Sequence, residues 1–136
     1  MASPKGREVI ELSEAQVKRG VTDYLEIMQA QGRLVYFRLN AGDFIEVRGN
    51  TRRRIKGAPK GTADLIVIQG GEVQMVHYNQ IEKTHPVTFV TFIECKSSKG
   101  KTSKEQDEFA EQVKKLHCRY QIVRSVDDLM EVLKRD

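Results

Sequence analysis

Cysteine and long hydrophobic runs are scarce in this sequence, and each shortage excludes a class of protein. Cys95 and Cys118 are too few for a disulfide framework, and they do not form a Cys-x-x-Cys pair. No stretch approaches the roughly 18 consecutive apolar residues of a membrane-spanning helix, and the N-terminus has no signal-peptide pattern. We therefore expect a protein of the reducing cytoplasm, with both cysteines acting as small core hydrophobes.

Several catalytic motifs are missing as well. His77, His85 and His117 are scattered and lack metal-ligand spacing, so surface or hydrogen-bonded positions are expected for all three. The sequence contains no Ser/His/Asp set, no phosphate-binding glycine motif, no zinc pattern and no internal repeat. These absences argue against a serine hydrolase, a P-loop nucleotide hydrolase and a zinc protein.

What is present is an ordinary globular composition. At 136 residues, with 39% hydrophobic and 31% charged residues, the chain is long enough to form one domain with a buried core. Residues 1–12 show no strong period and are expected to be a partly mobile tail, which leaves residues 13–136 as the domain. The formal net charge of +4 is only a weak indication of a polyanionic partner.

The basic residues cluster in one stretch. Six cations and no acid fall within the thirteen residues from Arg48 to Lys60. We interpret this stretch as a loop that contacts nucleic-acid phosphates, and a solvated flexible loop is the alternative. A second predicted loop, residues 97–101, adds two lysines. The candidate nucleic-acid-binding residues are Arg48, Arg52, Arg53, Arg54, Lys56, Lys60, Lys99 and Lys101.

Helical and strand periods alternate along the chain and predict a mixed sheet flanked by helices, which is the α/β class. Side chains in capping positions mark the start of three helices, and Gly32 marks the end of the first. The caps are Ser13 with Gln16, Ser103 with Gln106 or Thr102 with Glu105, and Ser125 with Asp128. The first two expected strands are Leu34–Leu39 and its hairpin partner Phe44–Val47, joined by a turn at Asn40–Asp43. The other expected strands are Leu65–Ile68, Val73–Tyr78, Phe89–Lys96 and Arg119–Val123. A turn is expected at Gln69–Glu72 and a connection at Asn79–Pro86.

One strand carries the chemistry. Phe89–Lys96 is rich in Val, Thr, Phe and Ile, as in a strand covered on both faces, and it ends in two opposite charges. Glu94 and Lys96 are two residues apart and therefore point to the same face, where burying them without a partner or a purpose is costly. Asp64 repeats the pattern, because it follows the glycine turn at Gly61 and precedes another apolar strand. Two acids and a lysine on neighbouring strands predict a metal site for phosphodiester cleavage, and a structural ion pair is the alternative.

These residues suit the requirements of that reaction. Phosphodiester hydrolysis needs an activated water, neutralised charge at phosphorus and a stabilised leaving oxygen, and one or two magnesium or manganese ions can supply all three. Asp64, Glu94 and the backbone carbonyl of Cys95 offer the oxygen ligands that such ions prefer. Lys96 can orient or deprotonate the attacking water, or counter the negative charge that grows on the phosphate.

Two further residues are expected close to this group. Gln106 lies one turn ahead of Phe109 on the apolar stripe of the second helix, so its amide should face inward near Lys96. Glu14 lies on the core-facing stripe of the first helix. It can either reach into the active site or simply stabilise the positive helix N-terminus, and the spacing does not separate the two.

Asp64 with Glu94-Cys95-Lys96 resembles the active site of the PD-(D/E)XK nuclease superfamily. A wider set of residues is similar to its VRR-NUC branch, over residues 13–133: Glu14, Asn40-Ala41-Gly42, Gly61-Thr62-Ala63-Asp64, Phe92-Ile93-Glu94-Cys95-Lys96, and Ser103 with Gln106. The resemblance implies a restriction-endonuclease-like fold and a small, often phage-encoded DNA endonuclease that depends on one or two Mg²⁺ or Mn²⁺ ions per subunit. It also implies a homodimer that acts on branched DNA such as four-way junctions in a bacterial cytoplasm, with no membrane and no organic cofactor. The active-site residues that it implies are Glu14, Asp64, Glu94, the Cys95 carbonyl, Lys96 and Gln106.

The chain departs from that family pattern at two places. Ala63 stands where the family often has proline before the aspartate, which alters the turn but keeps the ligand. The stretch Val73–Pro86 is longer than a minimal member of the family needs. A non-catalytic DNA-binding module and an RNA-directed binding protein on the same fold are the alternatives, and the intact Asp64, Glu94 and Lys96 argue against the first.

Overall fold

A computed structural model describes residues 11–134 of the chain, apart from the side chains of residues 81 and 82. It is a single small α/β domain with a mixed sheet and three helices, as the sequence predicts. Most of the predicted N-terminal tail lies outside the described residues. The elements are α1 (Glu14–Ala30), β1 (Val35–Arg38), β2 (Asp43–Arg48), β3 (Thr51–Lys56), β4 (Leu65–His77), β5 (Gln80–Cys95), α2 (Lys104–Lys115), β6 (Arg119–Val123) and α3 (Val126–Leu133).

The three helices begin where the capping residues predict. Ser13 and Ser103 each form a complete capping box, in which the serine hydroxyl accepts from a backbone N–H while a glutamine side chain accepts from the backbone N–H of the serine. Ser125 accepts from the backbone N–H of Asp128 at the start of α3. These contacts satisfy backbone donors that a helix leaves unpaired at its N-terminus, so short-range sequence is sufficient to place all three starts.

The main sheet has the strand order β1-β4-β5-β6, with β5 and β6 parallel and the other pairs antiparallel. Helix α2 makes the crossover between the two parallel strands. The register pairs Leu65 with both Arg38 and Ile93. The end of β1, the start of β4 and the end of β5 therefore lie side by side, at the same end of the sheet's strands.

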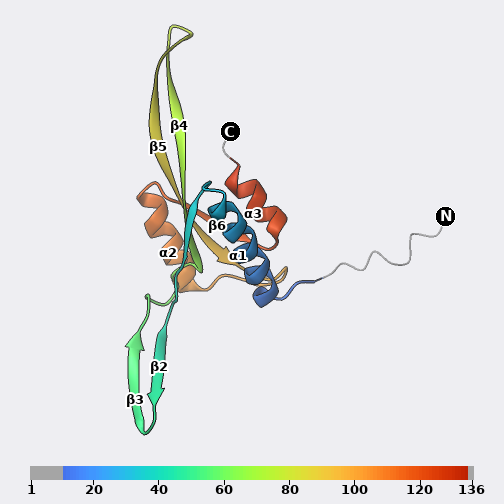
Figure 1. Ribbon diagram of the computed structural model, residues 1–136, viewed down its shortest axis with the longest axis vertical. Coiled ribbons are helices and arrows are strands. Elements are labelled where there is room, and N and C mark those ends of the chain that lie inside the picture. The colour runs from blue at the N-terminus through green and yellow to red at the C-terminus, as the bar shows by residue number, and fades with distance from the viewer. Residues whose placement is uncertain (1–10, 135–136) are drawn as a thin grey trace, which may run out of the picture.

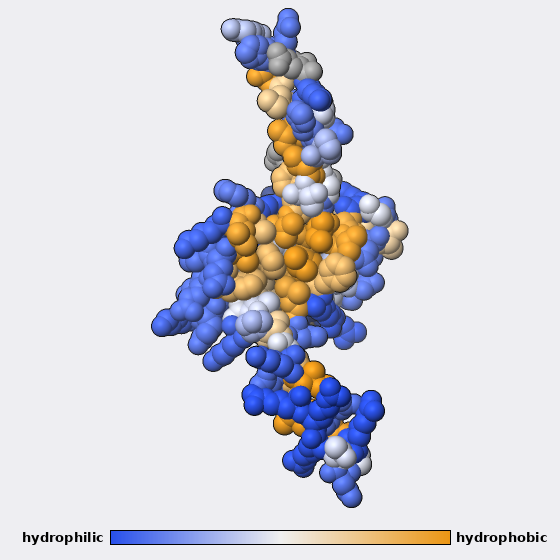
Figure 2. All heavy atoms as spheres, turned by 90° about the vertical axis from the view of Figure 1, so that its left-hand side faces the viewer, coloured by the Kyte–Doolittle hydropathy of each residue, from blue (hydrophilic) through white to orange (hydrophobic). Residues whose placement is uncertain are grey.

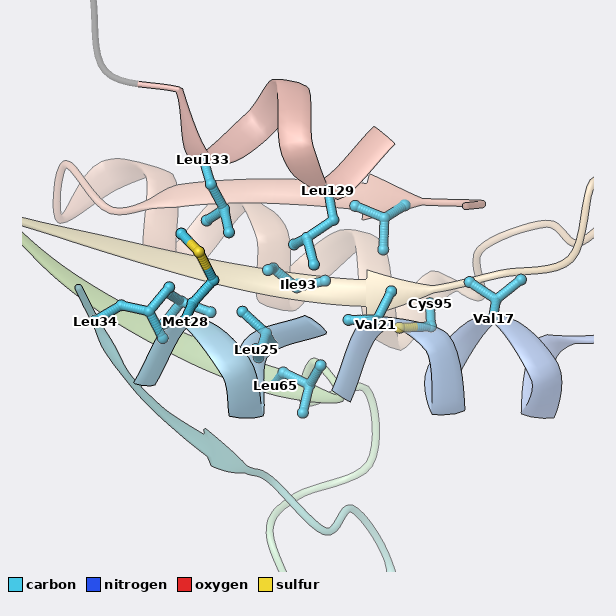
Figure 3. Close-up of a cluster of buried hydrophobic side chains, with 12 residues drawn as sticks. Val17, Val21, Leu25, Met28, Leu34, Leu65, Ile93, Cys95, Leu129 and Leu133 are labelled. Atoms are coloured by element: carbon cyan, nitrogen blue, oxygen red, sulfur yellow. The ribbon is translucent and has the colours of Figure 1, made fainter. Parts of the chain in front are cut away.

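Helices α1 and α3 cover one face of this sheet. Val21 and Leu25 from α1 and Leu129 from α3 are buried against Leu65 and Ile93 of the central strands, as Figure 3 shows. The apolar residues of α1 recur at helical spacing and form one stripe along the helix. Every second residue of the central strands points toward this stripe, so the helix and the strands bury one common core.

Helix α2 covers only part of the opposite face. Ala110 and Val113 pack there with Ala63 and Tyr120. The part of that face beside β1 is open: Phe37 is 55% exposed, and it faces Ile66 of β4 in the register. Figure 2 shows the corresponding gathering of hydrophobic residues across the middle of the body. Within the body, the sheet is thus covered by α1 and α3 on one side and only in part by α2 on the other.

The predicted hairpin between residues 34–39 and 44–47 is wrong, and so is the predicted basic loop. β1 pairs with β4, whereas β2 pairs with β3, so the stretch Thr51–Lys56 is a strand. The turn between β2 and β3 is Gly49-Asn50, and Gly49 has a φ of 56°, which suits the first position of a two-residue hairpin turn. The Gly-Asn pair is a recognised hairpin signal that the surrounding arginines obscured.

The predicted turn at Gln69–Glu72 and the predicted connection at Asn79–Pro86 are also wrong. β4 runs through Gly70 and Gly71 without turning, and both glycines pair with residues of β5. The chain reverses at Tyr78-Asn79, where both residues have positive φ, as a type I′ hairpin turn requires. β4 and β5 therefore form one long hairpin in place of the three short strands that were predicted.

Two hairpins project from the body in opposite directions (Figure 1). The outer part of β4 and β5 extends to one side, and the β2–β3 hairpin extends to the other. Within the part of the chain that is described, no helix is long and apolar enough to cross a membrane.

Candidate active site

The predicted site residues converge at the end of the sheet where the central strand β4 begins and the central strand β5 ends. Asp64 immediately precedes β4, and Glu94 and Lys96 lie at and just beyond the end of β5. The antiparallel register of these two strands, with Leu65 opposite Ile93, brings the three side chains to the same edge. The glycine before Asp64, Gly61, has a φ of 93°, and a Cβ there would lie 2.4 Å from the backbone oxygen of Glu105. Only glycine lets this turn approach the start of α2 so closely.

Lys96 lies between two carboxylates. Its Nζ is 3.7 Å from Oε1 of Glu94 and 3.6 Å from Oε1 of Glu14. The side chains of Glu94 and Lys96 are only 4% and 11% exposed, whereas that of Glu14 is half exposed. Glu14 therefore does reach the site from the first turn of α1, although it lies at the rim and not in the core.

Gln106 connects α2 to the site, as predicted. Its Nε2 donates to Oε1 of Glu94 at 2.9 Å, while its Oε1 accepts from the backbone N–H of Ser103 at 2.9 Å. The capping box therefore orients the amide so that its donor faces the carboxylate. The other carboxylate oxygen of Glu94, Oε2, is buried and has no hydrogen-bond partner among the described residues.

Asp64 is held from two directions. Its Oδ2 accepts from the backbone N–H of Cys95 at 2.8 Å, and its Oδ1 lies 3.1 Å from Nζ of Lys18. The bond to Cys95 fixes the carboxylate against the end of β5. It also leaves Asp64 and Glu94 on adjacent strands with their charges close enough to interact.

The electrostatics of Glu94 follow from this crowding. Burial, and then the nearby charge of Asp64, raise the pKa of Glu94 to about 7, against an opposing effect of Lys96. Burial also raises the pKa of the Cys95 thiol to about 12, so that thiol is a neutral core group, as predicted from the sequence. Burial therefore disfavours the charged form of the Glu94 carboxyl, and one of its oxygens has no hydrogen-bond partner among the described residues.

These features fit a divalent cation. Among residues 11–134, no group of three or more His, Cys, Asp and Glu side chains is arranged as a metal site. Magnesium does not need one, because it commonly takes one or two carboxylates together with waters and substrate phosphate oxygens. A cation held by Asp64 and Glu94 would neutralise their mutual repulsion and give Oε2 of Glu94 a partner. The Cys95 carbonyl lies in the sequence between the charged residues as a third candidate ligand.

Sequence reasoning missed Lys18. It lies one turn after Glu14 on α1, and partial burial lowers its pKa while the hydrogen bond to Asp64 and nearby acids raise it by more, so the pKa is raised overall. Lys18 also lines an open surface hollow together with Glu14 and Arg38. The Glu14/Lys18 spacing of four residues was the available signal, because it places both side chains on one helix face.

Tyr120 on β6 is a second residue that the sequence did not single out. Its ring lies beside Phe92 in the parallel register, and its hydroxyl is buried with no hydrogen-bond partner among the described residues. Burial, followed by the charge of Glu94, raises the pKa of the Tyr120 hydroxyl. The hydroxyl is therefore a neutral polar group in the wall behind the site.

The basic candidates fall into three places. The β2–β3 hairpin carries most of them, while Lys60 lies at its base, 3.8 Å from Glu105 at the start of α2. Lys99 and Lys101 are exposed on the loop that follows β5, and Lys99 is 3.6 Å from Glu11. The residues on the hairpin are Arg48, Arg52, Arg53, Arg54 and Lys56.

Comparison of the chain with models of protein families, with curated proteins and with solved structures gave no match.

Proposed function

We propose that this protein is a metal-dependent DNA endonuclease of the VRR-NUC branch of the PD-(D/E)XK superfamily, with a restriction-endonuclease-like fold. The observation that carries the proposal is the buried Glu94 carboxylate, which has one oxygen without a partner and lies beside Asp64 and Lys96 at one sheet edge. Burying an unsatisfied carboxylate oxygen costs stability, and a bound cation would give this oxygen a partner. The attraction of a bound cation would offset the free-energy cost of burying the Glu94 carboxylate.

Each residue has a distinct part in the proposed reaction. Asp64 and Glu94, with the Cys95 carbonyl, would hold Mg²⁺ or Mn²⁺, whose chemistry is charge neutralisation at the phosphate and acidification of water. Lys96 presents a cation beside Glu94, where it can orient an attacking water and offset negative charge on the phosphate. Gln106 fixes Glu94 through its amide, and Glu14 fixes Lys96 from the opposite side.

Lys18 is expected to hold Asp64 in place before the cation binds. Its ammonium contacts Oδ1 of Asp64, the oxygen that the Cys95 N–H leaves available. Because a lysine can move away on its flexible stem, the same contact need not block the carboxylate once a divalent ion competes for it.

A magnesium titration tests the proposed function. We expect cleavage of duplex or four-way-junction DNA to begin only when Mg²⁺ or Mn²⁺ is added to the metal-stripped protein, and to be absent with Ca²⁺. Single-stranded, duplex, flap and junction substrates compared under these conditions would identify the preferred structure. DNA binding without cleavage in any metal would favour the non-catalytic module. Cleavage or preferential binding of RNA would favour the RNA-directed alternative.

We also infer a homodimer, because symmetric cleavage of branched DNA needs two sites and two-fold dimers are the commonest closed assembly. The open part of the sheet face, with Val35 and Phe37 exposed beside Ile66 and Ile68, supports it. Contiguous exposed apolar surface of this kind marks interaction sites. The patch lies on an edge strand and next to it, on the face that α2 leaves uncovered.

Light scattering at micromolar concentration should give about twice the 15.6 kDa chain mass. Phe37→Glu should reduce the mass to that of one chain, because it introduces a charge into the proposed interface. Ile27→Glu is the matched control, since Ile27 is equally exposed but lies on α1. A wild-type monomer, or equal behaviour of the two variants, would contradict the proposed interface.

A further inference from the structure

The β2–β3 hairpin has no role in folding that its contacts explain. It is a separate two-stranded sheet, and its apolar side chains are open to solvent: Ile45 is 69% and Val47 is 62% exposed. An isolated two-stranded hairpin is at best marginally stable in water. A structure that projects from the body, with apolar and cationic residues exposed together, is typical of a surface that binds a partner.

The charge of the hairpin identifies the kind of partner. Between residues 43 and 56 there are five cations and two acids. The acids are used within the hairpin, because Asp43 accepts from Arg54 and Glu46 pairs with Arg48 at 2.6 Å. Arg52, Arg53 and Lys56 are exposed, have no ion pair among the described residues, and are available to a polyanion.

The two faces of the hairpin differ. Residues opposite each other in the register share a face, which places Arg52 beside Val47 and Arg54 beside Ile45 on one side. Arg53 lies on the other side, opposite Glu46. The first face thus combines guanidinium groups with aliphatic side chains, a combination that matches base edges and thymine methyl groups in duplex DNA.

The hairpin also leaves the body at the same end of the sheet as the candidate active site. Arg38, the last residue of β1, pairs with Leu65, and the backbone N–H of Leu39 donates to the carbonyl of Asp64 at 2.8 Å. The chain therefore enters the hairpin directly beside Asp64 and returns to it through Gly61. Figure 1 shows the hairpin pointing away from the body on that side, opposite the β4–β5 hairpin.

We propose that the β2–β3 hairpin enters the major groove of B-form duplex DNA next to the phosphate being cleaved, with the Arg52 face toward the base edges. This inference rests on the proposed nuclease function and adds how the duplex arm of the substrate is recognised. The major groove, roughly 12 Å wide, admits a two-stranded ribbon and presents a distinct pattern for each base pair, whereas the minor groove is only roughly 6 Å wide. Six residues per strand span about 20 Å, enough to reach along the groove from the site.

The same geometry predicts discrimination against RNA. The major groove of an A-form RNA helix is deep and too narrow for side chains to read. A ribbon that requires a wide groove therefore binds a DNA duplex and is excluded from an RNA duplex of the same sequence. Charge alone would not separate the two, because both carry the same phosphates.

Binding in Ca²⁺ tests the inference without cleavage. Wild-type protein should bind a 30-bp DNA duplex at least about tenfold more tightly than the matching RNA duplex. Arg52→Gln should remove most of that preference for DNA. It should also remove the protection that bound wild-type protein gives to guanine N7, a major-groove atom, against methylation by dimethyl sulfate. Arg53→Gln, one residue away on the other face, should retain N7 protection but lower the log–log salt slope by about 0.9. Lys115→Gln, the same charge change at the far end of α2, should leave all three measurements unchanged.

The outcomes separate this inference from the proposed function. Equal affinity of wild-type protein for DNA and RNA duplexes, absence of N7 protection, or identical effects of Arg52→Gln and Arg53→Gln would overturn groove entry. A protein that shows the groove signature in Ca²⁺ but cleaves no DNA in Mg²⁺ would instead support the groove contact and remove the nuclease assignment.

Discussion

Asp64→Ala and Glu94→Gln are each expected to reduce magnesium-dependent DNA cleavage by roughly 10³-fold or more, while DNA binding in Ca²⁺ changes little. Both substitutions remove a carboxylate from the sheet edge where the cation is proposed to bind. Glu94→Gln is nearly isosteric and keeps an acceptor for the Gln106 amide, so its effect reports on charge and not on shape. Single-turnover cleavage at saturating Mg²⁺ and a parallel binding assay would measure the two effects.

A stability measurement distinguishes lost chemistry from lost folding. Because the pKa of Glu94 is raised to about 7 in the folded, metal-free protein, the folded state binds more protons than the unfolded state between about pH 4.5 and pH 7. The free energy of unfolding therefore falls as the pH rises through this window. In EDTA, Glu94→Gln should raise the melting temperature relative to wild type at pH 8 and leave it nearly unchanged at pH 4.

Two results would contradict the assignment of these carboxylates. Near wild-type cleavage by either variant with magnesium would place the cation elsewhere. A lower melting temperature of Glu94→Gln at both pH values would make Glu94 an ordinary structural partner of Lys96, as in a buried ion pair whose disruption is destabilising.

Lys96→Met is the second substitution expected to have a large effect, with a loss of roughly 10²–10⁴-fold in the cleavage rate. Methionine keeps the aliphatic stem in a position that is 11% exposed but removes the ammonium next to Glu94 and Glu14. The fold should tolerate this change, because an unbranched apolar side chain adapts to an irregular site. Circular dichroism and thermal melting would verify that the variant is folded.

Gln106→Ala is the matched comparison for Lys96→Met. Both residues contact Oε1 of Glu94, but Gln106 contributes a neutral amide and no charge. Gln106→Ala should reduce the cleavage rate by about 10–100-fold, as for groups that orient a ligand without touching the reacting atoms. Retained activity in Lys96→Met, or an equal loss in the two variants, would show that the ammonium has no special part in the reaction.

Much of the candidate site could be predicted from the sequence because its residues are marked by short-range patterns. Glu94 and Lys96 interrupt an apolar strand at a spacing of two, which places them on one face whatever the strand pairs with. Gln106 is positioned by its own capping box with Ser103, a contact within four residues. Lys18 escaped prediction because its partner, Asp64, is distant in sequence, and a lysine on a helix is otherwise an ordinary surface residue.

The hairpins could not be predicted correctly, because strand pairing depends on residues far apart in the chain. Gly70 and Gly71 are typical of a turn, yet in the fold they pair with Thr88 and Val87 and continue the strand. Likewise, β1 was expected to pair with the next strand, but the central position of β4 offers a longer apolar partner. Local turn preferences are weak compared with the ladder hydrogen bonds and burial that a long-range pairing provides.

The sequence by itself determined the α/β class, the starts of the three helices, the final strand and the identity of the acidic and lysine side chains at the central strand. Each of these depends on contacts within about four residues or on a regular alternation, both of which can be read along the chain. Only the tertiary structure decided that the basic stretch is half of a projecting hairpin, that this hairpin leaves the body beside Asp64, and that Lys18 contacts that carboxylate. These features depend on which strand lies next to which, and that choice is made by the burial of the central strands against α1 and α3.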